Sequence, residues 1–171
     1  MTELEPRPVS ASRIELVRGM TLLDANGLGN VHGGVIMRMI DDAAGTAAAR
    51  HAGHVAVTAS VDELSFLQPV HVGDLLIVRA SVNAAGRTSM EVGVRVEAEP
   101  GRGGERRHTT SAYLTFVALD EDFNPTQVPP LLCETEEDRR REAQALIRRE
   151  VRKERIERIG TWRPERAPHE D

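Results

Sequence analysis

The hydrophobic period of the chain changes near residue 55, from that of a helix to that of β-strands. Upstream, Val35–His51 is rich in alanine, methionine and isoleucine and contains no proline. This composition predicts a helix that is apolar on most of its circumference and therefore buried. Downstream, apolar and polar residues alternate over residues 76–83 and, most regularly, over 89–98, and a last strand is expected over His108–Leu119.

Turn-forming residues separate these segments. Ala84–Arg87 is expected to form a tight hairpin and Pro100–Gly104 the next turn. A first strand is expected over Ile14–Leu23, before the helix. The order is one strand, one buried helix and then a run of antiparallel strands. This order predicts an α+β protein and excludes a doubly wound parallel sheet.

The length of 171 residues corresponds to about one domain. Residues 1–12 are polar and contain two prolines, so a mobile arm is expected there. The main domain is expected over residues 13–133. A highly charged helix with an apolar stripe is expected over residues 134–159, followed by a disordered tail over 160–171.

Composition excludes several classes of function. There are 22 basic and 27 acidic residues, and the net charge of −5 argues against binding to nucleic acid or to an anionic membrane. Cys133 is the only cysteine, which excludes a disulfide framework and a cysteine-ligated zinc site. No apolar run approaches the ~20 residues of a membrane span, and the N-terminus lacks an apolar signal core. A soluble, cytoplasmic protein is expected.

The strongest local signal is the segment Asn30-Val-His-Gly-Gly34, which opens the predicted helix. A helix N-terminus presents unpaired backbone N–H groups, and glycines allow a ligand to approach the backbone closely. The competing interpretation is structural, with Asn30 as N-cap and the glycines in a turn. A phosphate-binding loop is excluded because the GxxxxGK[ST] pattern is absent.

Two adjacent carboxylates, Asp41 and Asp42, lie in the middle of the predicted helix. Asp42 lies four residues after Arg38, so an ordinary surface ion pair is expected there. Helical spacing places Asp41 instead on a face of small residues, namely Ala44, Gly45 and Ala48. A carboxylate buried on such a face is held either for structure or for chemistry.

Other candidate residues carry weaker signals. His51 and His54 are expected to lie at the helix end, with no acidic or cysteine residue nearby to complete a metal site. The arginines between residues 139 and 158 alternate with glutamates, which is typical of a solvated helix. No G-x-S-x-G elbow marks a serine nucleophile.

Several motifs in order resemble the hotdog-fold acyl-CoA thioesterases, and in particular the cytosolic acyl-CoA hydrolases with the brain-type enzyme and its short bacterial relatives. The resemblance runs from about Leu22 into the C-terminal helix. It rests on the following motifs: Asn30-Val-His-Gly-Gly-Val-Ile-Met37, Asp41-Asp-Ala-Ala-Gly45, Ala48-Ala-Arg-His51, Val57-Thr-Ala-Ser-Val-Asp62, Phe66, Gly73-Asp74, Gly86-Arg-Thr-Ser-Met-Glu91 and Glu134-Thr-Glu-Glu-Asp138.

The resemblance implies a hotdog fold, in which an antiparallel sheet wraps around the long helix. It also implies dimers joined edge to edge through their sheets, with active sites at the dimer interface, and assembly of three dimers into a hexamer. The implied reaction is hydrolysis of acyl-CoA to a fatty acid and CoA, without a metal or organic cofactor.

The resemblance also implies roles for particular residues. Asp41 matches the catalytic carboxylate, a nucleophile or a general base, and Asn26 matches the catalytic asparagine. The backbone N–H groups near Gly33 and Gly34 match the group that polarises the thioester carbonyl. Segments that cradle CoA in related enzymes match Ala59, Ser60, Val61, Thr88, Ser89 and Met90, and a basic position near the CoA phosphates matches Arg148 or Arg149.

Two alternatives remain open at this point. A hotdog-fold enoyl-CoA hydratase or dehydratase would need a histidine in the site, and His32 would have to supply it. A non-catalytic acyl-CoA-binding module would use the same fold, although the presence of both Asn26 and Asp41 argues against it.

Spacing along the helix predicts a site shared by two chains. Gly33 and Asp41 are 41 − 33 = 8 residues apart, or about 12 Å at a rise of ~1.5 Å per residue. A reacting carbonyl carbon cannot lie within ~3–3.5 Å of two groups that far apart. A second copy is therefore expected to approach along the small face beside Asp41.

Overall fold

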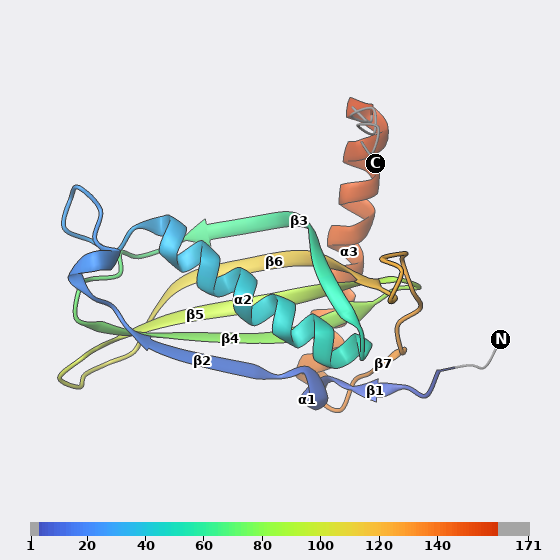
Figure 1. Ribbon diagram of the computed structural model, residues 1–171, viewed down its shortest axis with the longest axis horizontal. Coiled ribbons are helices and arrows are strands. Elements are labelled where there is room, and N and C mark those ends of the chain that lie inside the picture. Colours follow the sequence, from blue (N-terminus) through green and yellow to red (C-terminus); the bar gives the residue numbers. More distant parts are fainter. Residues whose placement is uncertain (1–3, 161–171) are drawn as a thin grey trace.

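The structure, a computed structural model, describes residues 4–160. Its main sheet is antiparallel, with the strand order β2-β4-β5-β6-β3. The strands are β2 (Ile14–Gly19), β3 (Val55–Phe66), β4 (Asp74–Ala85), β5 (Ser89–Pro100) and β6 (Arg107–Leu119). One long helix, α2 (Gly33–Ala52), connects the two edge strands β2 and β3 and crosses one face of the sheet (Figure 1). The predicted α+β architecture is confirmed.

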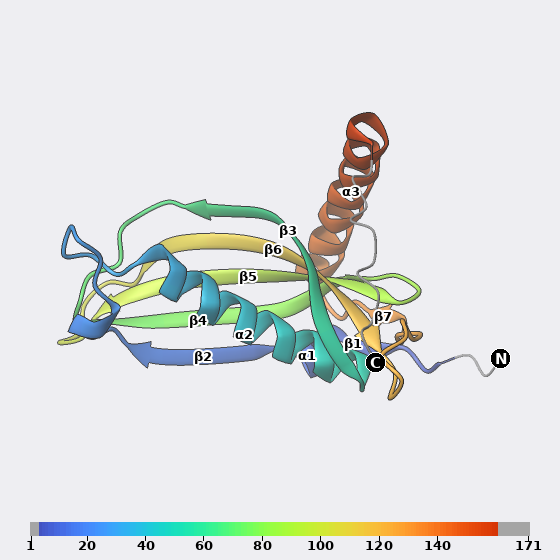
Figure 2. The same ribbon diagram turned by 45° about the horizontal axis from the view of Figure 1, so that its top comes forward.

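The remaining elements are short, except for the C-terminal helix. They are β1 (Arg7–Pro8), α1 (Val9–Ser12), the 3-10 turn η1 (Leu22–Asp24), β7 (Leu131–Leu132) and α3 (Glu136–Ile159). The first strand therefore ends earlier than expected, because η1 begins at Leu22. Helix α3 leaves the body of the protein at one end of the sheet (Figure 2). The tail was expected over residues 160–171, and all of it except Gly160 lies outside the described residues.

Helix α2 buries one side rather than most of its circumference, which corrects the sequence-based expectation. Its buried residues recur every three or four positions and are Ile36, Met39, Ile40, Ala43, Ala44, Ala47, Ala48, His51 and Ala52. They pack against the inner face of the sheet, where Leu114 and Phe116 of β6 are also buried. Alanines dominate because a large side chain would hold the helix away from the sheet.

The small residues of α2 pack against the protein's own sheet. Ala44 and Ala48 are fully buried, and a Cβ added to Gly45 would lie 3.5 Å from the Phe116 ring. The expectation that this face receives a partner helix is therefore wrong. None of the helices within residues 4–160 combines the length and the apolarity needed to cross a membrane.

The described part of the expected mobile arm, residues 4–12, makes specific contacts. Strand β1 pairs with β7 in parallel, and the backbone N–H of Arg7 donates to the carbonyl of Pro130. The Arg7 guanidinium donates to the carbonyls of Arg50 and His51, both at 2.7 Å. These carbonyls end α2 and have no partner within the helix, so Arg7 caps its C-terminus.

His51 is the one histidine of the described chain that is fully buried. Its Nε2 lies 3.0 Å from the carbonyl oxygen of Pro129, so the ring anchors the segment between β6 and β7. Burial lowers the pKa of His51, and the nearby charge of Arg7 lowers this pKa further, whereas the Pro129 carbonyl opposes the shift. The ring is therefore held in its neutral form.

This burial predicts an acid-sensitive fold. The unfolded chain binds a proton at His51 near the ordinary pKa of about 6.5, whereas the folded chain does so only at lower pH. The free energy of unfolding should therefore be greatest above pH ~6.5 and decrease as the pH falls, down to the lowered pKa of the folded state. Urea unfolding at pH 7.5 and 5.5 should show this decrease. His51→Gln should reduce it, and an unchanged decrease in this variant would exclude His51 as its source.

Candidate active site

A carboxylate on α2 and a hydroxyl on β3 meet at the open side of the helix. Thr58 Oγ1 donates to Asp41 Oδ1 at 2.6 Å. Both residues are exposed in the isolated chain. The hydrogen bond holds one carboxylate oxygen and leaves Oδ2 without a hydrogen-bond partner among residues 4–160, which is the arrangement of an oriented base or nucleophile.

The exposure of Asp41 corrects the expectation of a buried carboxylate on a face of small residues. That face packs against the sheet, and Asp41 lies at its border, toward the edge strand β3. Asp42 behaves as expected, because its carboxylate lies 3.9 Å from Arg38 Nε in a solvent-exposed ion pair. The two adjacent carboxylates thus have different surroundings, and Asp41 alone contacts another element of the fold.

The N-terminus of α2 is capped by His32, not by Asn30. His32 Nδ1 accepts the backbone N–H of Gly34 at 2.9 Å. The Gly34 N–H is therefore already used within the loop, which leaves Gly33 as the remaining candidate donor of the pair. Within residues 4–160, the Gly33 N–H has no partner, and the Phe66 ring lies beside its Cα.

Asn26 lies in the loop that leads into α2. Its side-chain oxygen accepts backbone N–H groups from Leu28 at 2.8 Å and from Asn30 at 3.2 Å. These bonds fix the carboxamide orientation and leave Nδ2 without a partner among the described residues. Asn26 therefore presents an oriented N–H donor near the end of α2 where Gly33 lies.

Strand β3 is an edge strand with an unpaired outer side in the isolated chain. It exposes the apolar side chains of Val57, Val61 and Phe66. Edge strands of this kind are normally covered or paired, because open backbone groups and apolar side chains promote association. The edge carries Thr58, so whatever covers it also borders the Asp41–Thr58 pair.

The sheet register brings the two predicted CoA-binding segments to one level. Thr58 pairs with Phe116 on β6, and Phe116 pairs on its other side with Met90. The Met90 side chain is buried in the core and cannot reach a ligand on the surface. Of this segment, only Thr88 and Ser89 remain candidates for contact with CoA. Ala59 and Val61 are exposed on β3, whereas the Ser60 hydroxyl donates to Asp62.

The two candidate arginines of α3 have different environments. Arg148 forms a two-point ion pair with buried Glu91 at 2.6 and 3.1 Å, and its guanidinium stacks 3.6 Å from the centre of the Tyr113 ring. This side chain is committed to the fold. Arg149 lies beside Gly86 at the β4–β5 hairpin, so it is the better placed of the two to contact a phosphate.

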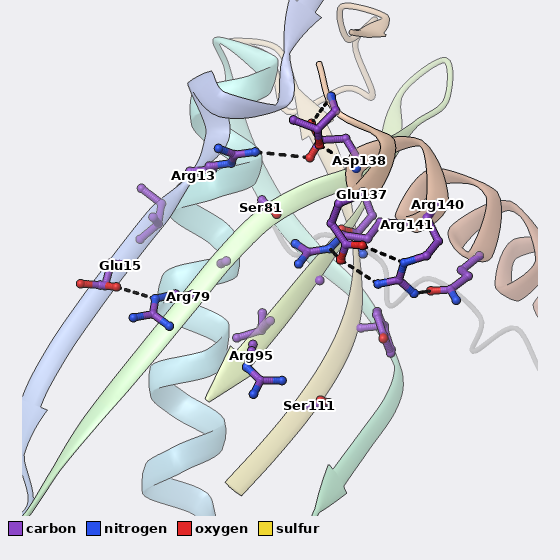
Figure 3. A pocket seen from close by; sticks show the side chains of 18 of the residues that line it. Arg13, Glu15, Arg79, Ser81, Arg95, Ser111, Glu137, Asp138, Arg140 and Arg141 are labelled. Atoms are coloured by element: carbon purple, nitrogen blue, oxygen red, sulfur yellow. Dashed lines mark hydrogen bonds and ion pairs between the residues drawn. The ribbon is translucent and has the colours of Figure 1, made fainter. Parts of the chain in front are cut away.

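A large cavity lies on the opposite face of the sheet from α2. It has a volume of about 790 Å³ and lies between the strands and the first turns of α3 (Figure 3). Its arginines are paired with carboxylates, as in Arg13 with Asp138 and Arg79 with Glu15. This cavity is separated from Asp41 by the sheet, so it is distinct from the candidate active site.

Metal ligands do not gather anywhere in residues 4–160, where no group of three or more histidine, cysteine, aspartate or glutamate side chains could hold an ion. His32 is occupied in capping α2, and no carboxylate of residues 4–160 forms an ion pair or a hydrogen bond with it. The pairing that a hydratase would require is therefore not formed within the described chain.

Comparison with known proteins identifies the family. Residues 28–105 match the thioesterase superfamily. An uncharacterized acyl-CoA thioester hydrolase of Bacillus subtilis, YkhA, is 39% identical over 78% of each chain. The chain belongs to the acyl-CoA thioester hydrolases of this superfamily. The cytosolic acyl coenzyme A thioester hydrolase of Rattus norvegicus is 36% identical to this chain. The match covers 80% of this chain but only 36% of the length of the rat protein.

Solved structures of acyl-CoA thioester hydrolases share the hotdog fold of the chain. An apo-hexameric acyl-CoA thioesterase has a TM-score of 0.87 and 40% identity, over 90% of this chain and 98% of the other. The acyl-CoA hydrolase of Staphylococcus aureus, solved with butyryl-CoA, CoA and CoA disulfide, has a TM-score of 0.84 and 35% identity, over 90% and 93% of the two chains. The predicted family and fold are confirmed.

One residue of the candidate site was not assigned from the sequence. Thr58 lies within the quoted motif Val57–Asp62, but neither its type nor its position in a strand distinguishes it from an ordinary surface threonine. Apolar and polar residues alternate regularly along this motif, as in an ordinary strand, so the sequence carries no signal of the irregular strand that positions Thr58.

Proposed function

We propose that the chain hydrolyses acyl-CoA thioesters to a fatty acid and CoA with Asp41, Thr58, Asn26 and the backbone N–H of Gly33. The observation that carries this proposal is the hydrogen bond from Thr58 to Asp41, which joins a carboxylate and a hydroxyl from two elements at an open face. Attack on the thioester places negative charge on the carbonyl oxygen. Oriented N–H donors are therefore needed as well as a base.

Asp41 supplies the base or the nucleophile. With Oδ1 held by Thr58, the free oxygen either accepts a proton from the attacking water or attacks the carbonyl carbon itself. In the second case an acyl–aspartyl anhydride forms as the thiolate leaves, and water then hydrolyses this anhydride to the fatty acid and free Asp41. Asn26 Nδ2 and the Gly33 N–H donate to the developing oxyanion. CoA leaves as a thiolate, which is a good leaving group, so the site needs no strong acid on the leaving side. The proposed reaction uses no metal or organic cofactor, and EDTA should leave its rate unchanged.

A spacing shared with a solved relative supports these assignments. Alanine variants of an asparagine, an aspartate and a threonine were solved for the Staphylococcus aureus acyl-CoA hydrolase. In that chain the aspartate lies 15 residues after the asparagine, and the threonine 17 residues after the aspartate. Asn26, Asp41 and Thr58 have the same spacings, 41 − 26 = 15 and 58 − 41 = 17.

The proposed site contains residues from two chains. Gly33 and Asp41 lie in one continuous helix, so about 12 Å along its axis separates them. Pairing of two β3 edges across a two-fold axis would cover the exposed strand and bring Asp41 and Thr58 of one chain toward Asn26 and Gly33 of the other. Three such dimers would form a hexamer, the state in which two of the similar structures are described. A cytoplasmic location is proposed by analogy with the cytosolic mammalian relatives.

The hydrolysis is tested with a panel of acyl-CoAs of increasing chain length, with released thiol as the readout. Burial and the nearby Glu142 carboxylate raise the pKa of Cys133 to about 11, so the protein's own thiol should give a low background near pH 7.5. Thiol release with several turnovers per chain is expected. Hydration of an enoyl-CoA without thiol release would favour the hydratase, and binding without either reaction would favour the acyl-CoA-binding module.

Arg149 is proposed to contact the phosphates of CoA. Arg149→Ala should raise KM for acyl-CoA about tenfold, the value of one charge-assisted hydrogen bond, and leave kcat nearly unchanged. The contact is equal in the ground and transition states, so it contributes to binding alone. Hydrolysis of an acyl-pantetheine, which lacks these phosphates, should not change. An equal loss on both substrates would contradict the phosphate contact.

A further inference from the structure

Strand β3 contains two β-bulges close to Thr58. Thr58 pairs with Phe116, but the next pair on β6 is Ser60 with Thr115, so Ala59 is an extra residue. A second shift between Val61 and Glu63 leaves Asp62 as another extra residue. Each bulge interrupts the simple alternation of side chains and changes the direction of the strand.

The bulges place neighbouring side chains on opposite faces of the sheet. Residues two apart in a regular strand share a face. Here Thr58 lies opposite Phe116 on the inner face and contacts Asp41, whereas Ser60 lies opposite Thr115 and contacts Asp62 on the outer face. The bulged conformation of β3 therefore allows the Thr58 side chain to lie on the inner face, toward α2, while the Ser60 side chain lies on the outer face.

A polar network on the outer face holds the second bulge. Asp62 Oδ1 accepts from Ser60 at 3.1 Å, and Asp62 Oδ2 accepts from Thr115 at 3.1 Å and from the Arg152 guanidinium of α3. Arg152 also donates to Thr115 Oγ1 at 2.7 Å. The Asp62 side chain is only 9% exposed and that of Arg152 17%, so little water reaches the pair and each side chain is the other's main polar partner.

We infer that Arg152 is a positioning residue for the reaction, which acts through Asp62 and the bulged strand to hold the Thr58 hydroxyl on Asp41. The inference rests on the proposed function, because it gives Arg152 a role only if the Thr58–Asp41 pair is catalytic. Arg152 itself lies on the face of the sheet opposite Asp41 and does not contact the reacting groups.

The docking of α3 does not depend on Arg152. One turn earlier on the helix, Arg148 holds Glu91 and the Tyr113 ring, and Ala145 is buried against the body of the protein. Loss of the Arg152 guanidinium therefore releases the bulge at Asp62 but leaves the helix in place. The variant should therefore stay folded at the assay temperature, so that a loss of kcat can be measured on folded protein.

The inference is tested by a double-mutant cycle between Arg152 and Thr58. Arg152→Gln should lower kcat about 10- to 100-fold, as expected for displacement of a catalytic group by a fraction of an ångström, with little change in KM. Tm should fall because Asp62 loses its partner, but the variant should remain folded at the assay temperature. Arg152→Lys should restore most of kcat, because an ammonium can still pair with Asp62. In a Thr58→Val background, Arg152→Gln should cause no further loss, since its route to Asp41 is already absent.

Asp62→Asn is the second variant. It keeps the shape of the side chain, removes its charge and replaces one of the two acceptor oxygens with an N–H donor, so the network on the second bulge is broken. It should reproduce the kcat loss of Arg152→Gln. Arg158→Gln is the matched control, because Arg158 lies on the same helix in an exposed pair with Glu154 and should leave kcat unchanged.

Three results would overturn the inference. These are an unchanged kcat in both Arg152→Gln and Asp62→Asn, equal fold-losses from Arg152→Gln with and without Thr58→Val, and a kcat loss that Arg152→Lys does not restore. Full activity of Thr58→Val and Asp41→Asn would instead contradict the proposed function itself. The two failures are therefore distinguishable.

Discussion

Asp41→Asn should lower kcat for acyl-CoA hydrolysis by about 10³-fold, because the amide can neither accept the proton of an attacking water nor attack the carbonyl. The side chain keeps its size, and its oxygen can still accept the Thr58 hydroxyl, so the fold should be retained. Thiol release under saturating substrate gives kcat directly, and circular dichroism reports the fold.

Asp42→Asn is the matched control for this experiment. Asp42 is the neighbouring residue in the same helix, but it faces solvent and pairs with Arg38. An exposed ion pair of this kind contributes little to stability, and the variant should retain most of its activity. The opposite ranking, with Asp42→Asn inactive and Asp41→Asn active, would contradict the assignment of Asp41.

Asn26→Ala should lower kcat by about 10²- to 10³-fold, the usual effect of removing one donor to an oxyanion. Alanine also removes the oxygen that accepts the N–H groups of Leu28 and Asn30, so part of the loss could arise from a disordered loop. Asn26→Asp separates the two effects, since it keeps an oxygen for both N–H groups and lacks the Nδ2 donor.

We expect Asn26→Asp to be as inactive as Asn26→Ala, with a Tm closer to that of the wild type. Measurement of kcat and Tm for both variants tests this. Activity near the wild-type level in Asn26→Asp would show that Asn26 serves the loop alone, and that the oxyanion donor is another group.

The architecture could be predicted from the sequence because local patterns determine it. The long proline-free helix and the regular alternation over 89–98 correspond to α2 and β5, with ends shifted by at most two residues. The prediction failed for features that depend on tertiary contacts. His32 caps α2 in place of Asn30, although asparagine is the better N-cap by type. The ordered contacts of residues 4–12 depend on Arg7 reaching the far end of α2.

The candidate site was predictable only in part. Family motifs pointed to Asp41 and Asn26. Helical spacing alone predicted a buried Asp41, whereas its side chain is exposed at the edge of the buried face of α2. Thr58 could not be identified, because its role depends on the two bulges of β3, and bulges leave no clear pattern in one sequence. The commitment of Arg148 to Glu91 likewise depends on where α3 docks.

The central claim is that one active site combines Asn26 of one chain with Asp41 of another, and subunit hybrids test it most directly. Asn26→Ala and Asp41→Asn variants are each nearly inactive alone under this account. They are unfolded, mixed in equal amounts and refolded, with refolded wild-type protein as the reference. About half of the dimers should then be hybrids with one intact site of two.

The account predicts recovery of up to about a quarter of the wild-type thiol-release rate, since half of the dimers each carry half of the sites. Mass spectrometry of the intact dimers confirms that the hybrids have formed. No recovery in a sample that contains these hybrids would place Asn26 and Asp41 of the same chain in one site, and would contradict the shared active site.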